Sequence, residues 1–197
     1  LKHFKVSFEE VDNAYVTQAE IDRIKELPYE PFSKKDVVRD LFLFCCCTGF
    51  RYGDLVSLIP VNFSNGMVNK LTGKTGKRVV VPLNPMARAI AEKFEFHFQN
   101  RLTYEQEFNQ LIKEICREAD MNEIFRKVYT VNGVRKEEVF QKWEVISSHT
   151  CRRSFCTNLF KRGMNLEDIA LFSGHSAIRI LKLYIKLTPE EKVMNFL

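Results

Sequence analysis

The chain has 197 residues, 45% of them hydrophobic, and its 30 lysines and arginines outnumber its 25 aspartates and glutamates, for a formal net charge of +5. This length and composition suit one domain with a hydrophobic core and exclude a largely disordered chain. No apolar run approaches the roughly 18 residues that a transmembrane helix needs, which excludes a membrane-spanning protein.

The N-terminal residues 1–16 are expected to be a linker. Residues 1–10 contain no initiator Met and carry charges throughout, which fits neither a signal peptide nor a natural start. We therefore expect a segment cut from a longer protein, with its domain over residues 17–197.

The first quarter of the chain predicts helices. Thr17-Gln18-Ala19-Glu20 has the form of a capping box and predicts a short helix to about residue 26. Ser33 is expected to cap a longer, deeply buried helix that ends near Thr48-Gly49. Another short helix is expected over about residues 52–58.

The rest of the chain alternates between hairpins and helices. Residues 67–71 and 77–83 predict two strands joined by a glycine-containing turn. Asn132-Gly133 predicts a second hairpin, with strands over residues 126–131 and 134–140. Further helices are expected over residues 85–98, 104–119, 148–163, 165–172 and 176–187, and from 189 onward. The predicted fold class is mostly α, with small antiparallel β-hairpins.

The six cysteines include three in a row, Cys45-Cys46-Cys47, and no Cys-x-x-Cys pair. Neighbouring residues on a helix point in different directions, so these three cannot converge on one metal ion. We expect buried core thiols in a reducing cytoplasm, and neither a metal site nor another cofactor.

The positive charge is concentrated in two segments. Residues 147–197 hold eight bases and four acids. Residues 61–82 hold no acid and four bases, namely Lys70, Lys74, Lys77 and Arg78. Such an excess is consistent with one surface that faces a polyanion, most often nucleic acid, or with an ordinary solvated face.

Polar residues at two helix ends require explanation. Arg51 follows a buried helix, and Asp54 three residues later can hold its guanidinium, as in a structural salt bridge. His149 and Arg152 share one face of the first turn of a helix, where backbone N–H groups point at any anion. A His-x-x-Arg pair alone is a weak signal.

His175 lies in a turn and Tyr184 follows nine residues later. A lone His in a turn is usually a cap, and a lone Tyr in an apolar run is usually a core residue. Together with the two arginines, His149 and a lysine at a hairpin tip, they form the set needed to attack a phosphodiester through a tyrosine.

These segments resemble the tyrosine recombinase family, the phage-integrase type of site-specific recombinase, over most of the chain. The Asn132-Gly133 hairpin has no counterpart in the family pattern. The matching segments are Thr48-Gly49-Phe50-Arg51-Tyr52-Gly53-Asp54-Leu55, Gly73-Lys74-Thr75-Gly76, Ser148-His149-Thr150-Cys151-Arg152-Arg153-Ser154-Phe155-Cys156-Thr157, Leu171-Phe172-Ser173-Gly174-His175 and Tyr184-Ile185-Lys186.

The resemblance implies an enzyme that cleaves and rejoins double-stranded DNA without metal or ATP. Tyr184 would attack a phosphodiester to give a 3′-phosphotyrosyl enzyme and a free 5′-hydroxyl, which conserves the bond energy for rejoining. A free Tyr has a pKa of about 10 and needs help at neutral pH. His149 would take the phenolic proton or bond the phosphoryl oxygen.

The resemblance also implies roles for the remaining candidates. Arg51 and Arg152 would neutralise the pentacoordinate transition state, with Asp54 bracing Arg51. His175 would be a second phosphate donor, and Lys74 is suited to protonate the leaving 5′-oxygen. The expected DNA-binding residues are Lys70, Lys77, Arg78 and Arg153.

The family further implies partners. An N-terminal core-binding domain usually helps to clamp the DNA, so the isolated domain is expected to be monomeric and to bind DNA weakly. The full-length protein is expected to form a tetramer on DNA through the tail helix 189–197, during integration or excision of a mobile element. A type IB topoisomerase, a DNA-binding module without catalysis and a helical structural protein are the alternatives.

Overall fold

A computed structural model describes residues 14–74, 76–99, 101 and 104–187. Most of the expected linker and the whole expected tail helix therefore lie outside the described residues. Residues 14–16, the described end of the expected linker, are buried, and the Val16 amide donates to Ser154 Oγ over 2.8 Å. This end of the linker thus packs into the domain.

Two predicted helices form the centre of the core. In α1 (Gln18–Glu26) both bonds of the capping box are present, because the Glu20 amide donates to Thr17 Oγ1 and the Thr17 amide to Glu20 Oε2. Helix α2 (Lys34–Thr48) begins after the Ser33 cap and is largely buried. It ends at Gly49, whose φ of 71° is the left-handed conformation that glycine adopts without strain.

The first predicted hairpin is present, and a third strand extends it into a three-stranded sheet. Helix α3 (Tyr52–Leu55) is shorter than predicted, and η1 (Pro60–Asn62) leads into β1 (Phe63–Ser64). Strand β1 pairs with β2 (Met67–Leu71), which pairs with β3 (Arg78–Pro82), all antiparallel. The two-residue β1 is too short to show an alternating pattern in the sequence.

Helix α4 (Pro85–Lys93) begins at the predicted Asn84 cap and ends five residues before the predicted 98. Glu95 and Phe96 have φ values of 52° and 58°, which reverse the chain. The reversal buries both Phe94 and Phe98. Burial of these rings thus decides where the helix ends.

Helix α5 (Glu105–Glu118) agrees with the prediction, and it precedes the second hairpin. Strands β4 (Ile124–Val131) and β5 (Val134–Gln141) pair in the register set by Asn132-Gly133, both of which have positive φ. This hairpin is confirmed, and each strand is longer than predicted.

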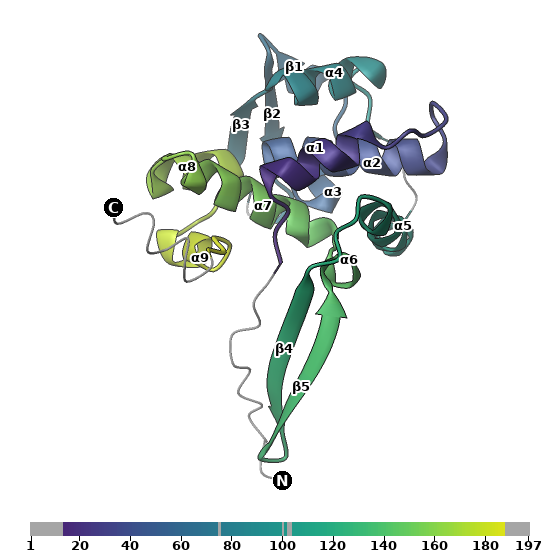
Figure 1. Cartoon of the computed structure of the whole chain (residues 1–197). Coiled ribbons are helices and arrows are strands. Elements are labelled where there is room, and N and C mark those ends of the chain that lie inside the picture. Colours follow the sequence, from purple (N-terminus) through teal and green to yellow (C-terminus); the bar gives the residue numbers. More distant parts are fainter. Residues whose placement is uncertain (1–13, 75, 100, 102–103, 188–197) are drawn as a thin grey trace.

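The C-terminal third is helical. The short α6 (Lys142–Val145) was not predicted, α7 (Ser148–Lys161) and α8 (Leu166–Ser173) were, and α9 (Ile178–Lys182) is shorter than predicted. Figure 1 shows α1, α2 and α7 in the middle, α4 with the three-stranded sheet on one side, and the β4–β5 hairpin projecting on the opposite side. The predicted class, mostly α with small antiparallel β elements, is confirmed.

The cysteines belong to the core as expected. All six are free thiols, and five are buried, with Cys47 half-buried. Among the described residues, no helix is long and apolar enough to cross a membrane, and no three His, Cys, Asp or Glu side chains gather as a metal site.

Candidate active site

The six candidate catalytic residues come together from five parts of the chain. A cleft of about 590 Å³ is lined by Arg51, Lys74 and His149 among others. Arg152, His175 and Tyr184 join it through direct contacts with one another and with His149. The fold therefore assembles residues that are up to 133 positions apart, from 51 to 184.

Arg152 is the most buried of the candidates, at 2% exposure. Its guanidinium donates to the Gly49 carbonyl over 2.7 Å and to the Ser173 carbonyl. These two carbonyls lie at the ends of α2 and α8, where backbone acceptors have no partner inside the helix. Its Nε has no hydrogen-bond partner among the described residues, so a buried donor remains for an anion.

Arg51 is held less tightly. It precedes α3, and its Nη1 lies 3.9 Å from Asp54 Oδ2, which confirms the expected pair as a loose one. That buried Nη1 has no hydrogen-bond partner among the described residues. A second arginine donor thus remains unsatisfied in the same region, as a site for a phosphate requires.

Asp54 has a second contact that the sequence did not indicate. Its Oδ1 accepts the Gly73 amide over 2.8 Å, which links α3 to the β2–β3 turn beside Lys74. The turn is closed by Thr72, whose amide donates to the Lys77 carbonyl over 2.9 Å. Lys74 itself is exposed on this turn and lines the cleft.

His149 and Tyr184 form the contact with the clearest chemical meaning. His149 Nε2 and Tyr184 Oη are 2.9 Å apart. Partial burial of the ring lowers the pKa of His149 below its ordinary value of 6.5, and the nearby charges of Arg153, Arg152, Arg51 and Lys74 lower it further. A neutral imidazole is therefore present at neutral pH to accept the phenolic proton.

His175 is buried at 6% exposure beneath the tyrosine. Its Nδ1 is 2.6 Å from Ser173 Oγ, and its ring meets the Tyr184 ring edge-on at 4.5 Å between centroids. Burial, followed by the charge of Arg152, lowers the pKa of His175 to about 3. At neutral pH it is an uncharged ring.

The four expected DNA-binding bases differ in their surroundings. Lys70 donates to the Ser57 carbonyl, Lys77 to the His175 carbonyl and Arg153 to the Ala14 carbonyl, while Arg78 bonds the Asn69 side chain. Lys77 therefore also ties the β2–β3 turn to the segment of His175. DNA binding by these residues stays a prediction.

Residues 14–191 match the family model described as the phage integrase family. The chain belongs to the phage integrase family. This family member is 25% identical over 182 residues to a tyrosine recombinase of Pseudothermotoga lettingae, covering 90% of this chain and 58% of the relative.

Two solved structures share its fold at 15% identity, covering 93% of this chain. They are XerA recombinase, with a TM-score of 0.68, and the Tn1549 transposon integrase in complex with a circular intermediate DNA, with a TM-score of 0.61. This family member spans 64% and 65% of those chains and 58% of the curated relative, less than two thirds in each case.

Sequence reasoning missed one residue that this family member uses to place its tyrosine. Thr157 Oγ1 donates to the Tyr184 carbonyl over 3.1 Å and accepts the Lys186 amide over 3.1 Å. Two backbone groups on the C-terminal side of the tyrosine are therefore fixed to α7, which also carries His149 and Arg152. A Thr inside a helix gives no sequence signal of such a bond.

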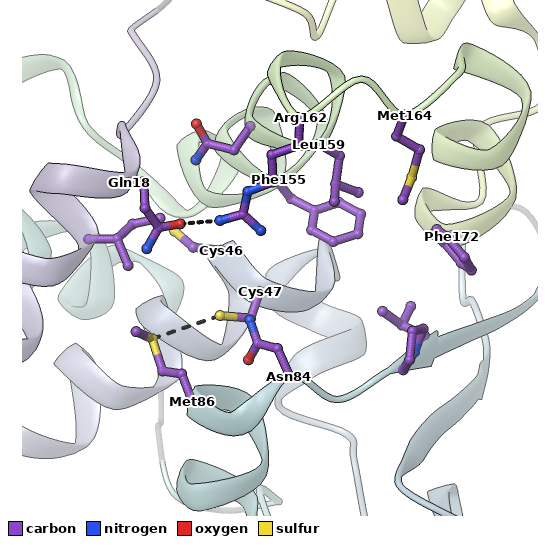
Figure 2. A pocket seen from close by; sticks show the side chains of 14 residues that line it. Gln18, Cys46, Cys47, Asn84, Met86, Phe155, Leu159, Arg162, Met164 and Phe172 are labelled. Atoms are coloured by element: carbon purple, nitrogen blue, oxygen red, sulfur yellow. Dashed lines mark hydrogen bonds between the residues drawn. The ribbon is translucent and has the colours of Figure 1, made fainter.

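A second cavity, of about 250 Å³, lies along the C-terminal half of α7, and none of the six catalytic candidates lines it (Figure 2). Its wall includes Phe155, Leu159, Met164 and Phe172, with Arg162 bonded to Gln18 at the edge. The ring of Phe155 also packs on Gly49, where a Cβ would come within 2.4 Å of it. This cavity is mostly apolar and is separate from the catalytic cleft.

Proposed function

We propose that this chain is the catalytic part of a site-specific DNA recombinase, an integrase that cleaves and rejoins strands through Tyr184. The observation that carries the proposal is the 2.9 Å contact between Tyr184 Oη and His149 Nε2, beside two arginines with unsatisfied donors. A nucleophile in contact with a neutral base and next to an anion site is the arrangement that phosphoryl transfer requires.

The cleavage step follows from these positions. Tyr184 Oη attacks the phosphorus and gives its proton to His149 Nε2, while the bond to the 5′-oxygen breaks and that oxygen takes a proton from Lys74. A 3′-phosphotyrosyl bond has then formed and a 5′-hydroxyl has left. The number of phosphodiester-type bonds is unchanged, so the reverse reaction rejoins DNA without an external energy source.

The arginines stabilise the charge that develops on the phosphoryl oxygens. Arg152 is rigid because two carbonyls hold it, so it is preorganised for that role. Arg51 has the freer guanidinium. His175 would contact the same oxygens through the ring nitrogen that does not face the Ser173 hydroxyl.

The decisive experiment is covalent capture. The chain is incubated with nicked duplexes of randomised sequence, in which cleavage releases a short strand and traps the tyrosyl adduct. We expect an adduct that denaturing gels resolve, and we expect Tyr184→Phe to abolish it with little change in DNA affinity, because the substitution removes a hydroxyl and no charge. An adduct that persists in Tyr184→Phe would place the nucleophile on another tyrosine.

The partners and setting belong to the same proposal. The substrate is double-stranded DNA, on which the full-length protein assembles as a tetramer through residues 189–197, to integrate or excise a mobile element. The solved Tn1549 integrase–DNA complex supports DNA as the partner. The six free thiols are consistent with the reducing cytoplasm expected from the sequence.

A further inference from the structure

The β4–β5 hairpin is the largest element that the catalytic cleft does not use. Figure 1 shows it projecting from the helices as a two-stranded ribbon. Every β5 residue is exposed except the half-buried Phe140, so side chains on both faces of the strand meet solvent. An isolated two-stranded hairpin is at best marginally stable in water, so an extension of this kind is best explained by a partner that covers it.

The base of the hairpin is firmly attached beside the active site. Lys142, the first residue of α6, is buried and forms ion pairs with Glu20 at 2.7 Å and Glu123 at 3.1 Å. Its amide also donates to the Glu123 carbonyl over 2.8 Å. Helix α6 then leads directly to α7, whose second residue is His149. The ribbon is thus fixed to the helix that carries the general base.

The charge of the outer ribbon favours a polyanion. Residues 126–136 contain four bases and no acid. The ladder places Glu138 opposite Lys127, but it places the uncharged Thr130 and Tyr129 opposite Arg135 and Lys136. Arg135 and Lys136 are exposed, and no described carboxylate forms an ion pair with either. A second copy of this chain, itself carrying a net charge of +5, is a poor match for such a surface.

The dimensions also suit DNA. Strands of eight residues extend for about 26 Å at roughly 3.3 Å per residue, which corresponds to about eight base-pair rises of roughly 3.4 Å along a duplex. The major groove of B-DNA is wide enough to admit a two-stranded β-ribbon. A ribbon of this length reaches well beyond a single phosphate at the catalytic cleft.

We propose that the β4–β5 ribbon is a second DNA-binding element, which lies along a groove of the duplex flanking the cleaved phosphate and places Arg135 and Lys136 on backbone phosphates. This inference rests on the proposed function only in taking DNA as the substrate. The ribbon lengthens the DNA contact, while cleavage stays with the six residues of the cleft.

The test measures the affinity of the whole chain for a fluorescent 40-base-pair duplex of random sequence over a range of salt concentrations. A plot of log K against log salt has a negative slope, and each lost phosphate contact reduces the magnitude of that slope by about 0.9. The double variant Arg135→Ala with Lys136→Ala should therefore reduce the magnitude by about two. The matched control, Glu137→Gln with Glu138→Gln, removes two charges of the opposite sign from the same strand. It should leave affinity unchanged or raise it.

A second measurement does not depend on a weakened variant. A photoreactive benzoylphenylalanine at Val134, which is 61% exposed at the tip, should cross-link to the duplex. The same probe at Phe32, 57% exposed beside the acidic Asp36, should not. Three outcomes would each overturn the proposal. They are an unchanged salt slope in the Arg135/Lys136 variant, an equal loss of affinity in the Glu137/Glu138 variant, and cross-links from position 134 to protein alone.

The covalent capture assay separates this inference from the proposed function. If the ribbon binds DNA, the Arg135/Lys136 variant still forms the Tyr184 adduct at saturating DNA concentration. If the unmodified chain forms no adduct but the salt slope still falls in the variant, the catalytic proposal fails and the DNA-binding ribbon stands.

Discussion

The six candidate catalytic residues come from five parts of the chain and are held in different ways, which gives the proposed roles separable tests. Arg152 is held by two helix-end carbonyls, whereas Lys74 is exposed on a turn that the Asp54–Gly73 bond connects to α3. A rigid arginine suits charge stabilisation. An exposed lysine whose side chain can extend to the leaving 5′-oxygen suits proton delivery. The two kinds of role respond differently to a change of leaving group.

The effect of Lys74→Ala on the cleavage rate should therefore depend on which atom leaves the phosphorus. Protonation is essential for an alkoxide but hardly matters for a thiolate, because a thiol has a pKa of only about 8.5. We expect Lys74→Ala to cleave normal DNA poorly. On DNA with sulfur in place of the bridging 5′-oxygen, it should approach the rate of the unmodified chain. Equal impairment on both substrates, measured by adduct formation, would make Lys74 a phosphate contact and return the acid role to His149 or His175.

The lowered pKa of His149 predicts the pH dependence of cleavage. The base must be neutral, so the cleavage rate should rise as pH increases through the His149 pKa, below 6.5, and then level off. Arg153 is a charge that lowers this pKa, so Arg153→Gln should raise it and move the acid limb to higher pH. The control, Arg78→Gln, removes a base that is not among the main causes. Single-turnover rates at saturating DNA provide the measurement, and coincident acid limbs for both variants would contradict the assignment.

At the scale of elements, α7 connects the proposed base, one proposed catalytic arginine and the proposed nucleophile. His149 and Arg152 lie in its first two turns, and Thr157 in a later turn fixes the backbone just after the Tyr184 side chain. The tyrosine follows the short α9 rather than forming part of it. Its position therefore depends on the bonds to Thr157 more than on helical structure of its own.

Replacing the Thr157 hydroxyl should move the nucleophile. Thr157→Val removes two hydrogen bonds of about 1 kcal/mol each, so we expect about 2 kcal/mol less stability in urea unfolding and a larger, separate loss of single-turnover cleavage. DNA affinity should not change. Thr157→Ser, which keeps the oxygen, should restore cleavage. A loss of stability with no loss of cleavage would show that Thr157 is only structural.

Some of these elements could be predicted from the sequence and others could not. Local signals were sufficient where a cap or turn residue decides the outcome, as with Thr17, Ser33 and Asn132-Gly133. They failed where tertiary contacts decide. Helix α4 stops because Phe94 and Phe98 enter the core on either side of a chain reversal.

The candidate site also has a part that the sequence predicts and a part that it does not. The residue types and their order identified the six catalytic candidates, since the chemistry constrains what the side chains must be. The bonds from Asp54 to Gly73, from Lys77 to the His175 carbonyl and from Thr157 to Tyr184 involve backbone groups that every residue has. No side-chain pattern in the sequence could indicate them.

At the scale of the molecule, DNA contact and self-assembly are assigned to different parts of the chain. The cleft and the β4–β5 ribbon both carry basic residues, whereas the C-terminal segment, which lies outside the described residues, contains the apolar Val193, Met194, Phe196 and Leu197. Assembly should therefore be removable without loss of the fold.

Deletion of residues 189–197 tests this separation. We expect the truncated full-length protein to bind DNA but to form fewer tetramers in sedimentation experiments, with a nearly unchanged melting temperature. A control deletion of Val193 to Leu197 alone removes the apolar stripe and should have the same effect. A melting temperature lowered by many degrees would show instead that the tail packs on its own chain.

The contact between His149 and Tyr184 is formed by two segments of the same chain, and this affects the timing of the proposed reaction. Because the fold holds the proposed base and nucleophile 2.9 Å apart, no loop closure is needed to bring them together. The proposed reaction then requires a phosphate bound between the two arginines. In the proposed reaction, the arrival and alignment of a phosphate therefore set the timing, so cleavage should keep pace with the docking of each DNA strand and wait on no prior rearrangement of the tyrosine.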